Sequence, residues 1–132
     1  MSLIFKTTTT DQEVLANGII PLTTITRRLG RNIQSSGDNV LLLAPGYYSV
    51  NVGITFTAET AGDVTINLQV NGIDSPGFTA TETITTATTE VRTVTLSGIL
   101  RVFCNSGSAS LTLVNASEVG ITVSNVAITV TD

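Results

Sequence analysis

The sequence predicts an all-β protein, and three observations support this fold class. Apolar residues recur at every second position, β-branched residues are abundant, and short turn motifs separate the apolar segments. Alternation at spacing two is typical of strands with one face in a core, whereas an amphipathic helix needs apolar residues at spacings of three and four. We therefore expect roughly eight to ten short strands, no helix, and a two-sheet antiparallel sandwich or barrel.

The chain has 132 residues, which fit one domain, so we expect a single folded unit over residues 1–132. Residues 4–35 are expected to hold the N-terminal strands and a connecting segment. Residues 1–3 (Met-Ser-Leu) resemble a remnant of cloning, and we assign them no functional role.

The clearest strands are predicted over residues 47–57 and 63–71, which are bracketed by turn motifs such as Pro45-Gly46 and Asn71-Gly72. In each segment, one face is apolar and the other carries mostly small or polar residues. The apolar positions are Tyr48, Val50, Val52, Ile54 and Phe56 in the first segment, and Val64, Ile66, Leu68 and Val70 in the second.

Two later segments interrupt the alternation. Between residues 89 and 104 the apolar phase slips at Ser97-Gly98, which predicts a β-bulge or a strand bent between two sheets. Residues 121–130 shift phase at Ser124-Asn125. Long central strands and an alternating last strand favour a jelly roll over an immunoglobulin domain, which needs a buried Trp and a Cys pair, while this sequence has no Trp and one Cys.

The composition predicts a protein that covers much of its surface by association. Only 12% of residues are charged and 42% are hydrophobic, which favours burial against copies of the chain or against a larger assembly. The longest apolar run has about six residues, against roughly 20 in a membrane-spanning helix. The net charge of −4 and the absence of a basic run argue against nucleic-acid binding, and the first residues lack the pattern of a secretion signal.

Candidates for catalysis or metal binding are few. Histidine is absent, so the commonest general base and zinc ligand is missing. The one cysteine, Cys104, follows an apolar segment and is expected to be a buried, unreactive thiol. The ten carboxylates fall mostly in turns or beside Thr and lack the loop spacing of a calcium site. We predict no catalytic, cofactor-binding or metal-binding residues, and no enzyme activity.

Three segments carry a resemblance to a known family. Residues 45–52 (Pro-Gly-Tyr-Tyr-Ser-Val-Asn-Val) resemble the Gly-x-Tyr-x-Val opening of the long central strand of TNF/C1q-like jelly rolls. Residues 64–72 resemble the next strand of that family, and residues 119–130 resemble its last strand, which returns to the centre of the inner sheet. The resemblance implies a TNF/C1q-like jelly roll and a homotrimer packed around an axis through the inner-sheet edges.

Residues 5–33 are similar to small bacteriophage and prophage proteins of Gram-positive hosts, which are head-fibre, decoration or other virion components. This resemblance implies a virion location for a protein made in the bacterial cytoplasm. No collagen-like Gly-x-y stalk precedes the domain, which favours a compact surface module over a secreted signalling molecule.

Two groups of residues are candidates for contacts with partners. Tyr47, Phe103 and Val114 are apolar residues on the predicted outward side of their strands, and they are candidates for an interface. Arg27, Arg28 and Arg31 account for half of the Lys and Arg residues, and they are candidates for docking onto acidic groups of a capsid or a neighbouring subunit.

The leading hypothesis is a non-enzymatic homotrimeric component of a phage or prophage particle, of the capsid-decoration or fibre type. The alternative is a jelly-roll module of the bacterial cell or spore surface that binds a glycan or a host protein. A small enzyme with carboxylate chemistry is a third hypothesis, for which the sequence offers no particular residues.

Overall fold

Eleven β-strands and no helix make up the computed structural model over the residues it describes, which are 1–37, 39–103 and 107–132. No described segment is therefore a helix able to cross a membrane. The strands are β1 (Leu3–Thr8), β2 (Gln12–Val14), β3 (Thr24–Leu29), β4 (Ile33–Ser36), β5 (Val40–Leu43), β6 (Gly46–Ala58), β7 (Gly62–Val70), β8 (Ile73–Ile84), β9 (Arg92–Val102), β10 (Ala109–Asn115) and β11 (Ile121–Thr131).

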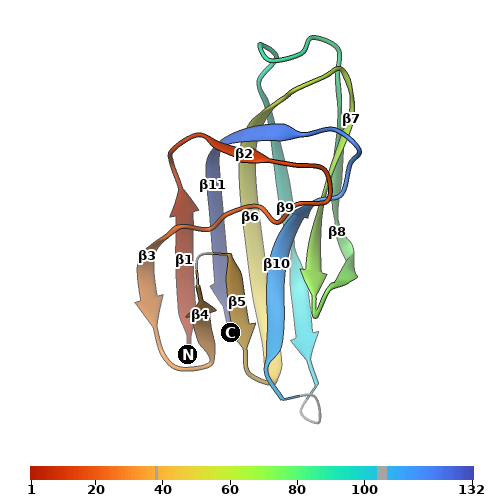
Figure 1. Cartoon of the computed structure of the whole chain (residues 1–132). Coiled ribbons are helices and arrows are strands. Elements are labelled where there is room, and N and C mark those ends of the chain that lie inside the picture. Colours follow the sequence, from red (N-terminus) through yellow and green to blue (C-terminus); the bar gives the residue numbers. More distant parts are fainter. Residues whose placement is uncertain (38, 104–106) are drawn as a thin grey trace.

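The strands form two antiparallel sheets that face each other (Figure 1). Sheet A has the order β3-β1-β11-β6-β9, and β2 pairs with the first residues of β11. Sheet B has the order β4-β5-β10-β7-β8. Most neighbours in space are distant in sequence, as in a jelly roll, so the predicted fold class is confirmed.

The core lies between the sheets and follows the alternation seen in the sequence. In β6 the side chains of Tyr48, Val50, Ile54 and Phe56 are buried, while Tyr47 is exposed. The inward positions of β7 are also buried as predicted, apart from the partly exposed Val70 at its end. Each fully buried large aliphatic or aromatic side chain contributes about 1.5–3 kcal/mol to folding, so this face-specific pattern dictates which side of each strand joins the core.

The bulge predicted at Ser97-Gly98 is wrong. β9 pairs with β6 without any shift in register, and Gly98 occupies an inward position between the buried Leu96 and Leu100. The inward position is glycine because the ring of Phe78, from β8 in sheet B, fills the space: a Cβ at Gly98 would lie 2.8 Å from Phe78 Cζ. Ile99 therefore points outward, where it is 67% exposed.

The phase shift predicted at Ser124-Asn125 is confirmed. The pairing of β11 with β6 changes register between Val123 and Asn125. Val123 and Val126 are both buried on either side of the shift, so the irregularity returns the apolar residues of both halves of β11 to the core.

Ser2 has a structural role that the sequence does not reveal. It is buried, its backbone N–H donates to Asp132 Oδ1 at 2.6 Å, and its Oγ accepts from the backbone N–H of Asn32 at 3.1 Å. The two chain termini consequently lie together at one end of the sandwich (Figure 1). Cys104, whose thiol was predicted to be buried, lies outside the described residues, as does Asp38.

Candidate functional site: the outward face of sheet A

The outward face of sheet A has an uncharged centre lined by small side chains. Gly53 of β6 lies between Ala127 of β11 and Thr95 of β9, and Asn51 lies between Thr129 and Ser97 in the next row. These residues surround a hollow of about 330 Å³, because Gly53 has no side chain and Ala127 has a single methyl group. A face of this kind allows another protein surface to approach closely without desolvating a charge.

The β9 edge of this face carries an exposed apolar cluster. The side chains of Tyr47, Ile99 and Phe103 are 62%, 67% and 55% exposed. Arg101 lies among them, with its Cζ 4.5 Å from the ring centroid of Phe103 and 5.3 Å from that of Tyr47. Such cation–π contacts are worth about 0.5–1 kcal/mol at exposed sites, and they restrict the guanidinium without neutralising it. We call Tyr47, Ile99, Arg101 and Phe103 the β9 cluster.

The opposite edge of the same face carries a second apolar cluster. Leu29 at the end of β3 is 59% exposed, and Leu3 and Phe5 of β1 are partly exposed. We call these three residues the β1–β3 cluster. The pairing registers align the two clusters, because one cross-strand row runs through the five residues Leu29, Leu3, Thr131, Ser49 and Ile99.

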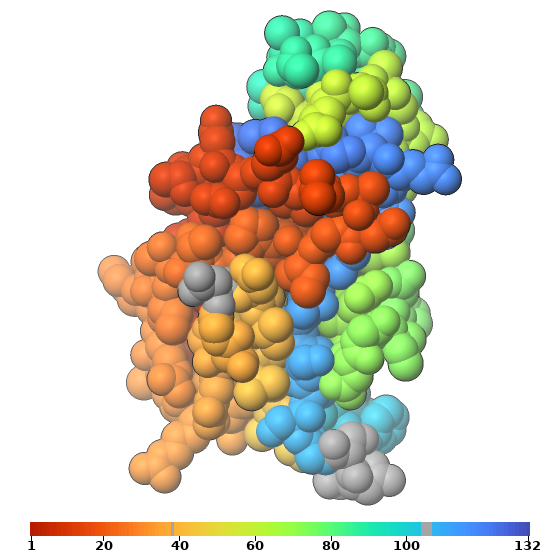
Figure 2. Space-filling view, viewed as in Figure 1, coloured from red at the N-terminus to blue at the C-terminus, as the bar shows by residue number. Residues whose placement is uncertain are grey.

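The structure places Arg27, Arg28 and Arg31 at one corner of the molecule. They lie on β3 and in the turn that follows it, beside the chain termini, and all three are exposed. Arg27 pairs with Phe5 and Arg28 pairs with the buried Ile4, so these adjacent arginines point to opposite sides of the edge strand. Segment 24–32, orange in Figure 2, projects at the lower left of the molecule.

The prediction that Val114 is an exposed interface residue is wrong. Val114 is only 7% exposed, so it is not a surface anchor. Its outward parity on β10 was predicted correctly, but the N-terminal segment passes over it: Ile19 forms a bridge with Val114, and the backbone N–H of Ile20 donates to Leu113 O at 2.8 Å. In Figure 2 this red-to-orange segment lies across the upper part of the molecule.

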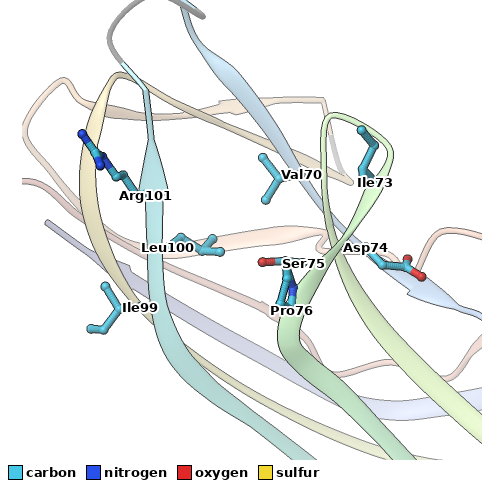
Figure 3. Close-up of a pocket in the computed structure, with 8 residues that line it drawn as sticks. All are labelled: Val70, Ile73, Asp74, Ser75, Pro76, Ile99, Leu100 and Arg101. Carbon is cyan, nitrogen blue, oxygen red and sulfur yellow. The ribbon is translucent and has the colours of Figure 1, made fainter.

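A cavity of about 390 Å³ lies in the gap between β8 and β9, beside the β9 cluster. Figure 3 shows Leu100 and Val70 pointing into the gap, while Arg101 and Asp74 point away from it. The Asp74 carboxylate instead accepts a hydrogen bond from Gln69 Nε2 at 2.9 Å. Binding and catalytic pockets need several convergent polar groups, whereas in this gap the hydroxyl of Ser75 faces the apolar side chains of Leu100 and Val70.

Carboxylates do not gather into a metal site in the part of the chain that the structure describes, where no three His, Cys, Asp or Glu side chains come together. Glu13 and Glu59 are two carboxylates that do interact. A hydrogen bond between their side chains raises the pKa of Glu59, with smaller contributions from burial and from the charge of Glu13.

No protein-family model matches the sequence, and no curated protein matches it either. Solved structures do match the fold. The globular domain of zebrafish complement 1qA protein has a TM-score of 0.69 at 8% identity, covering 99% of this chain and 96% of that chain. A crystal structure of murine APRIL has a TM-score of 0.64 at 11% identity, covering 99% and 98%.

The fold is a jelly roll of the TNF/C1q type. It is also similar to the PRD1 vertex protein P5, with a TM-score of 0.57 at 15% identity, covering 100% of this chain and 73% of that chain. At these identities the likeness concerns the fold alone. The resemblance of residues 5–33 to virion proteins has no support from a sequence match.

The prediction that Tyr47 and Phe103 face outward is confirmed, and their role in an interface stays a prediction. The sequence did not single out the other members of the two clusters, which are Ile99, Arg101, Leu29, Leu3 and Phe5. The outward orientation of Ile99 was not recognised because a bulge was predicted at Ser97-Gly98. The alternation of buried residues nevertheless continues across Gly98, through Val94, Leu96, Leu100 and Val102. Leu29 and Arg101 became recognisable only when the pairing of β3 with β1 and of β9 with β6 placed them on this face.

Proposed function

We propose that the chain is a non-enzymatic assembly module that forms a homotrimer through the outward face of sheet A. The observation that carries this proposal is the pair of exposed apolar clusters at opposite edges of one sheet, aligned on a single cross-strand row. An interface that joins two different patches of identical subunits closes into a ring when the rotation between subunits allows it.

The alignment of the clusters favours a ring whose axis runs along the strands. Rotation about such an axis leaves every row at its own height, so Ile99 of one copy meets Leu3 and Leu29 of the next. Aromatic residues and arginine are enriched at the energetic centres of interfaces, which fits the β9 cluster. The TNF/C1q-type fold supports three copies in the ring.

The trimer is proposed to be a structural component of a phage or prophage particle, of the capsid-decoration or fibre type, made in the bacterial cytoplasm and located in the virion. The similarity of the fold to the PRD1 vertex protein P5 supports this assignment. Arg27, Arg28 and Arg31 are the proposed docking group, which would bind acidic groups of a capsid or a neighbouring subunit.

Light scattering at about 500 mM salt, where charges are screened within a few ångströms, tests the trimer. We expect the wild-type mass to be about 41 kDa, three times the chain mass of 13.8 kDa. Ile99→Asp and Leu29→Asp each disable one edge and should both give the monomer mass. Leu15→Asp is the matched control, because Leu15 is 69% exposed but lies outside sheet A, and it should leave the trimer intact.

A mixture of the two edge variants sharpens the test. Each Ile99→Asp chain retains its β1–β3 cluster and each Leu29→Asp chain retains its β9 cluster, so one functional interface forms and the ring stays open. We expect the mixture to contain mixed dimers and no trimer. A wild-type monomer at micromolar concentration, or loss of the trimer in Leu15→Asp alone, would refute the proposed interface.

A further inference from the structure

The exposed charges are separated by sign between the two ends of the sandwich. The end that carries the chain termini has Arg27, Arg28, Arg31 and Arg101, together with Asp74 and Asp132. The opposite end, which carries β2 and the long loops of Figure 1, has seven carboxylates and Arg92. These carboxylates are Asp11, Glu13, Glu59, Asp63, Glu82, Glu90 and Glu118. We call the two ends the arginine end and the carboxylate end.

Few of these charges are neutralised within the chain. Over residues 1–37, 39–103 and 107–132 the ion pair found is Arg92 with Glu90, and both partners belong to the carboxylate end. The four arginines of the arginine end have no ion pair with a described carboxylate. The two aspartates at that end accept hydrogen bonds from amide groups: Asp74 from Gln69, and Asp132 from Asn32 and the backbone of Ser2.

The ends are too far apart to cancel each other. β6 runs the length of the sandwich with 13 residues, which corresponds to about 43 Å at roughly 3.3 Å per residue. The Debye length is about 8 Å at physiological ionic strength. Each end therefore presents its own sign to an approaching molecule, and another copy of the chain presents the complementary sign at its opposite end.

The carboxylate end is also electrostatically crowded. Glu59 N–H donates to Gly120 O at 2.9 Å, which places the Glu59 side chain beside the connection between β10 and β11, and Glu13 of β2 lies opposite Thr122 of β11. Glu13 and Glu59 interact with each other, and Glu118 is exposed in the same connection. An incoming guanidinium would relieve this repulsion and could pair with two carboxylates at once.

We propose that trimers of this chain stack head to tail, with the arginine end of one trimer seated on the carboxylate end of the next. The inference rests on the proposed trimer, in which cyclic symmetry gathers three copies of each end on the same side and makes three contacts at once. A contact between two different surfaces along an axis does not close, so the expected product is a linear stack. This stack gives the docking arginines a defined partner.

Two variants, neither at a residue with an ion pair among the described residues, reverse the charge of one end each. Arg28→Glu/Arg31→Glu changes the arginine end, and the quadruple variant Asp11→Lys/Glu13→Lys/Glu59→Lys/Glu118→Lys changes the carboxylate end. Thr79→Glu/Thr112→Glu is the control, because these positions lie on β8 and β10 of sheet B, between the two ends. The measurement is sedimentation velocity with light scattering at about 20 mM and about 500 mM salt.

For wild-type protein and for the control, we expect multiples of the trimer mass at low salt and the trimer mass at high salt. Each charge-reversed variant alone should remain a trimer at both salt concentrations, because its two ends now carry the same sign. An equimolar mixture of the two variants should again exceed the trimer mass at low salt, since one supplies acidic ends and the other basic ends.

The outcomes separate the two proposals. A wild-type trimer that does not grow at low salt, or a mixture that does not recover, overturns the stack and leaves the trimer standing. A wild-type monomer at high salt overturns the trimer. Low-salt growth that survives both charge reversals would show that apolar surfaces drive association, and would also overturn the stack.

Discussion

A methyl group added at Gly98 would collide with the ring of Phe78. The ideal Cβ position lies 2.8 Å from Phe78 Cζ and 3.2 Å from Cε2, well inside the separation of about 3.5–4.0 Å at which carbon atoms attract each other. Phe78 is 3% exposed and bridges the two sheets at the edge where β8 faces β9, so the ring has little freedom to move away.

We expect Gly98→Ala to destabilise the fold by about 1–2 kcal/mol. Overpacking a core destabilises the folded state by roughly 1–3 kcal/mol. The lower conformational entropy of the unfolded Ala variant offsets about 0.4–1 kcal/mol of this loss. The thermal midpoint should fall by roughly 3–8 °C. The assay is urea or thermal unfolding at one protein concentration, because association makes apparent stability depend on concentration.

A double-mutant cycle isolates the collision. Phe78→Leu removes part of the ring from a buried site and should cost about 1–2 kcal/mol. It also removes the atom that the new methyl group meets, so the double variant should be more stable than the sum of the single effects by about 0.5–1.5 kcal/mol. Ser97→Ala, one residue away and outward-facing, is the control and should cost less than about 0.5 kcal/mol. A Gly98→Ala protein as stable as wild type, or strictly additive effects, would refute the reasoning.

Two further predictions concern polar contacts. The Glu90 carboxylate accepts hydrogen bonds from Thr85 and pairs with Arg92, and these contacts lower its pKa to about 2. A lowered folded-state pKa means that the stabilising contribution is complete above the ordinary value of 4.5 and is lost as pH falls toward 2; the NMR carboxyl resonance of Glu90 should therefore keep its ionised shift at about pH 3, and a midpoint near 4.5 would contradict this. Tyr48→Phe removes the buried hydroxyl that donates to Ala44 O, which should cost about 1–2 kcal/mol in urea unfolding because the acceptor loses its partner; unchanged stability would show that this bond contributes nothing.

Strand identity could be predicted from the sequence wherever one face of a strand is buried and the other is not. β6 and β7 are examples, because burial acts on every second residue and leaves a readable pattern. The same rule failed at Gly98, where a side chain from the opposite sheet takes the place of the missing one. Periodicity within one strand contains no information about which ring fills a gap from the facing sheet.

Surface exposure was less predictable than strand parity. Val114 has outward parity, but the segment around Ile19 covers it, and this path depends on the topology of the whole chain. Lys6 shows the converse: it is 1% exposed, and its Nζ donates to Ser35 Oγ at 2.8 Å. A lysine at an inward position of an edge-proximal strand is not recognisable as buried from the sequence, because the alternation of residues 3–8 has apolar residues on both faces.

The outward face of sheet A could not be assembled from the sequence because it depends on register. Leu29 and Ile99 belong to one row only because four successive strand pairings align them, and a shift of one residue in any pairing would turn a side chain to the other face. The order β3-β1-β11-β6-β9 then puts the two apolar clusters at opposite edges of one sheet.

The low charge of the chain matters at the two edges of sheet A, where charged residues would protect an exposed strand. β9 ends sheet A with 11 residues and β3 ends it on the other side, and long exposed edge strands are sites of uncontrolled pairing unless charges, proline or a covering element protect them. β3 has Arg27 and Arg28, but β9 has one arginine at each end and none across the Thr, Ser and Gly residues between them. A free monomer would leave that edge unprotected, whereas packing of the β9 cluster against the next copy would cover it. A closed ring would therefore remove the exposed edge at β9 that makes a free monomer prone to uncontrolled strand pairing. For this reason we assign assembly to sheet A rather than to sheet B.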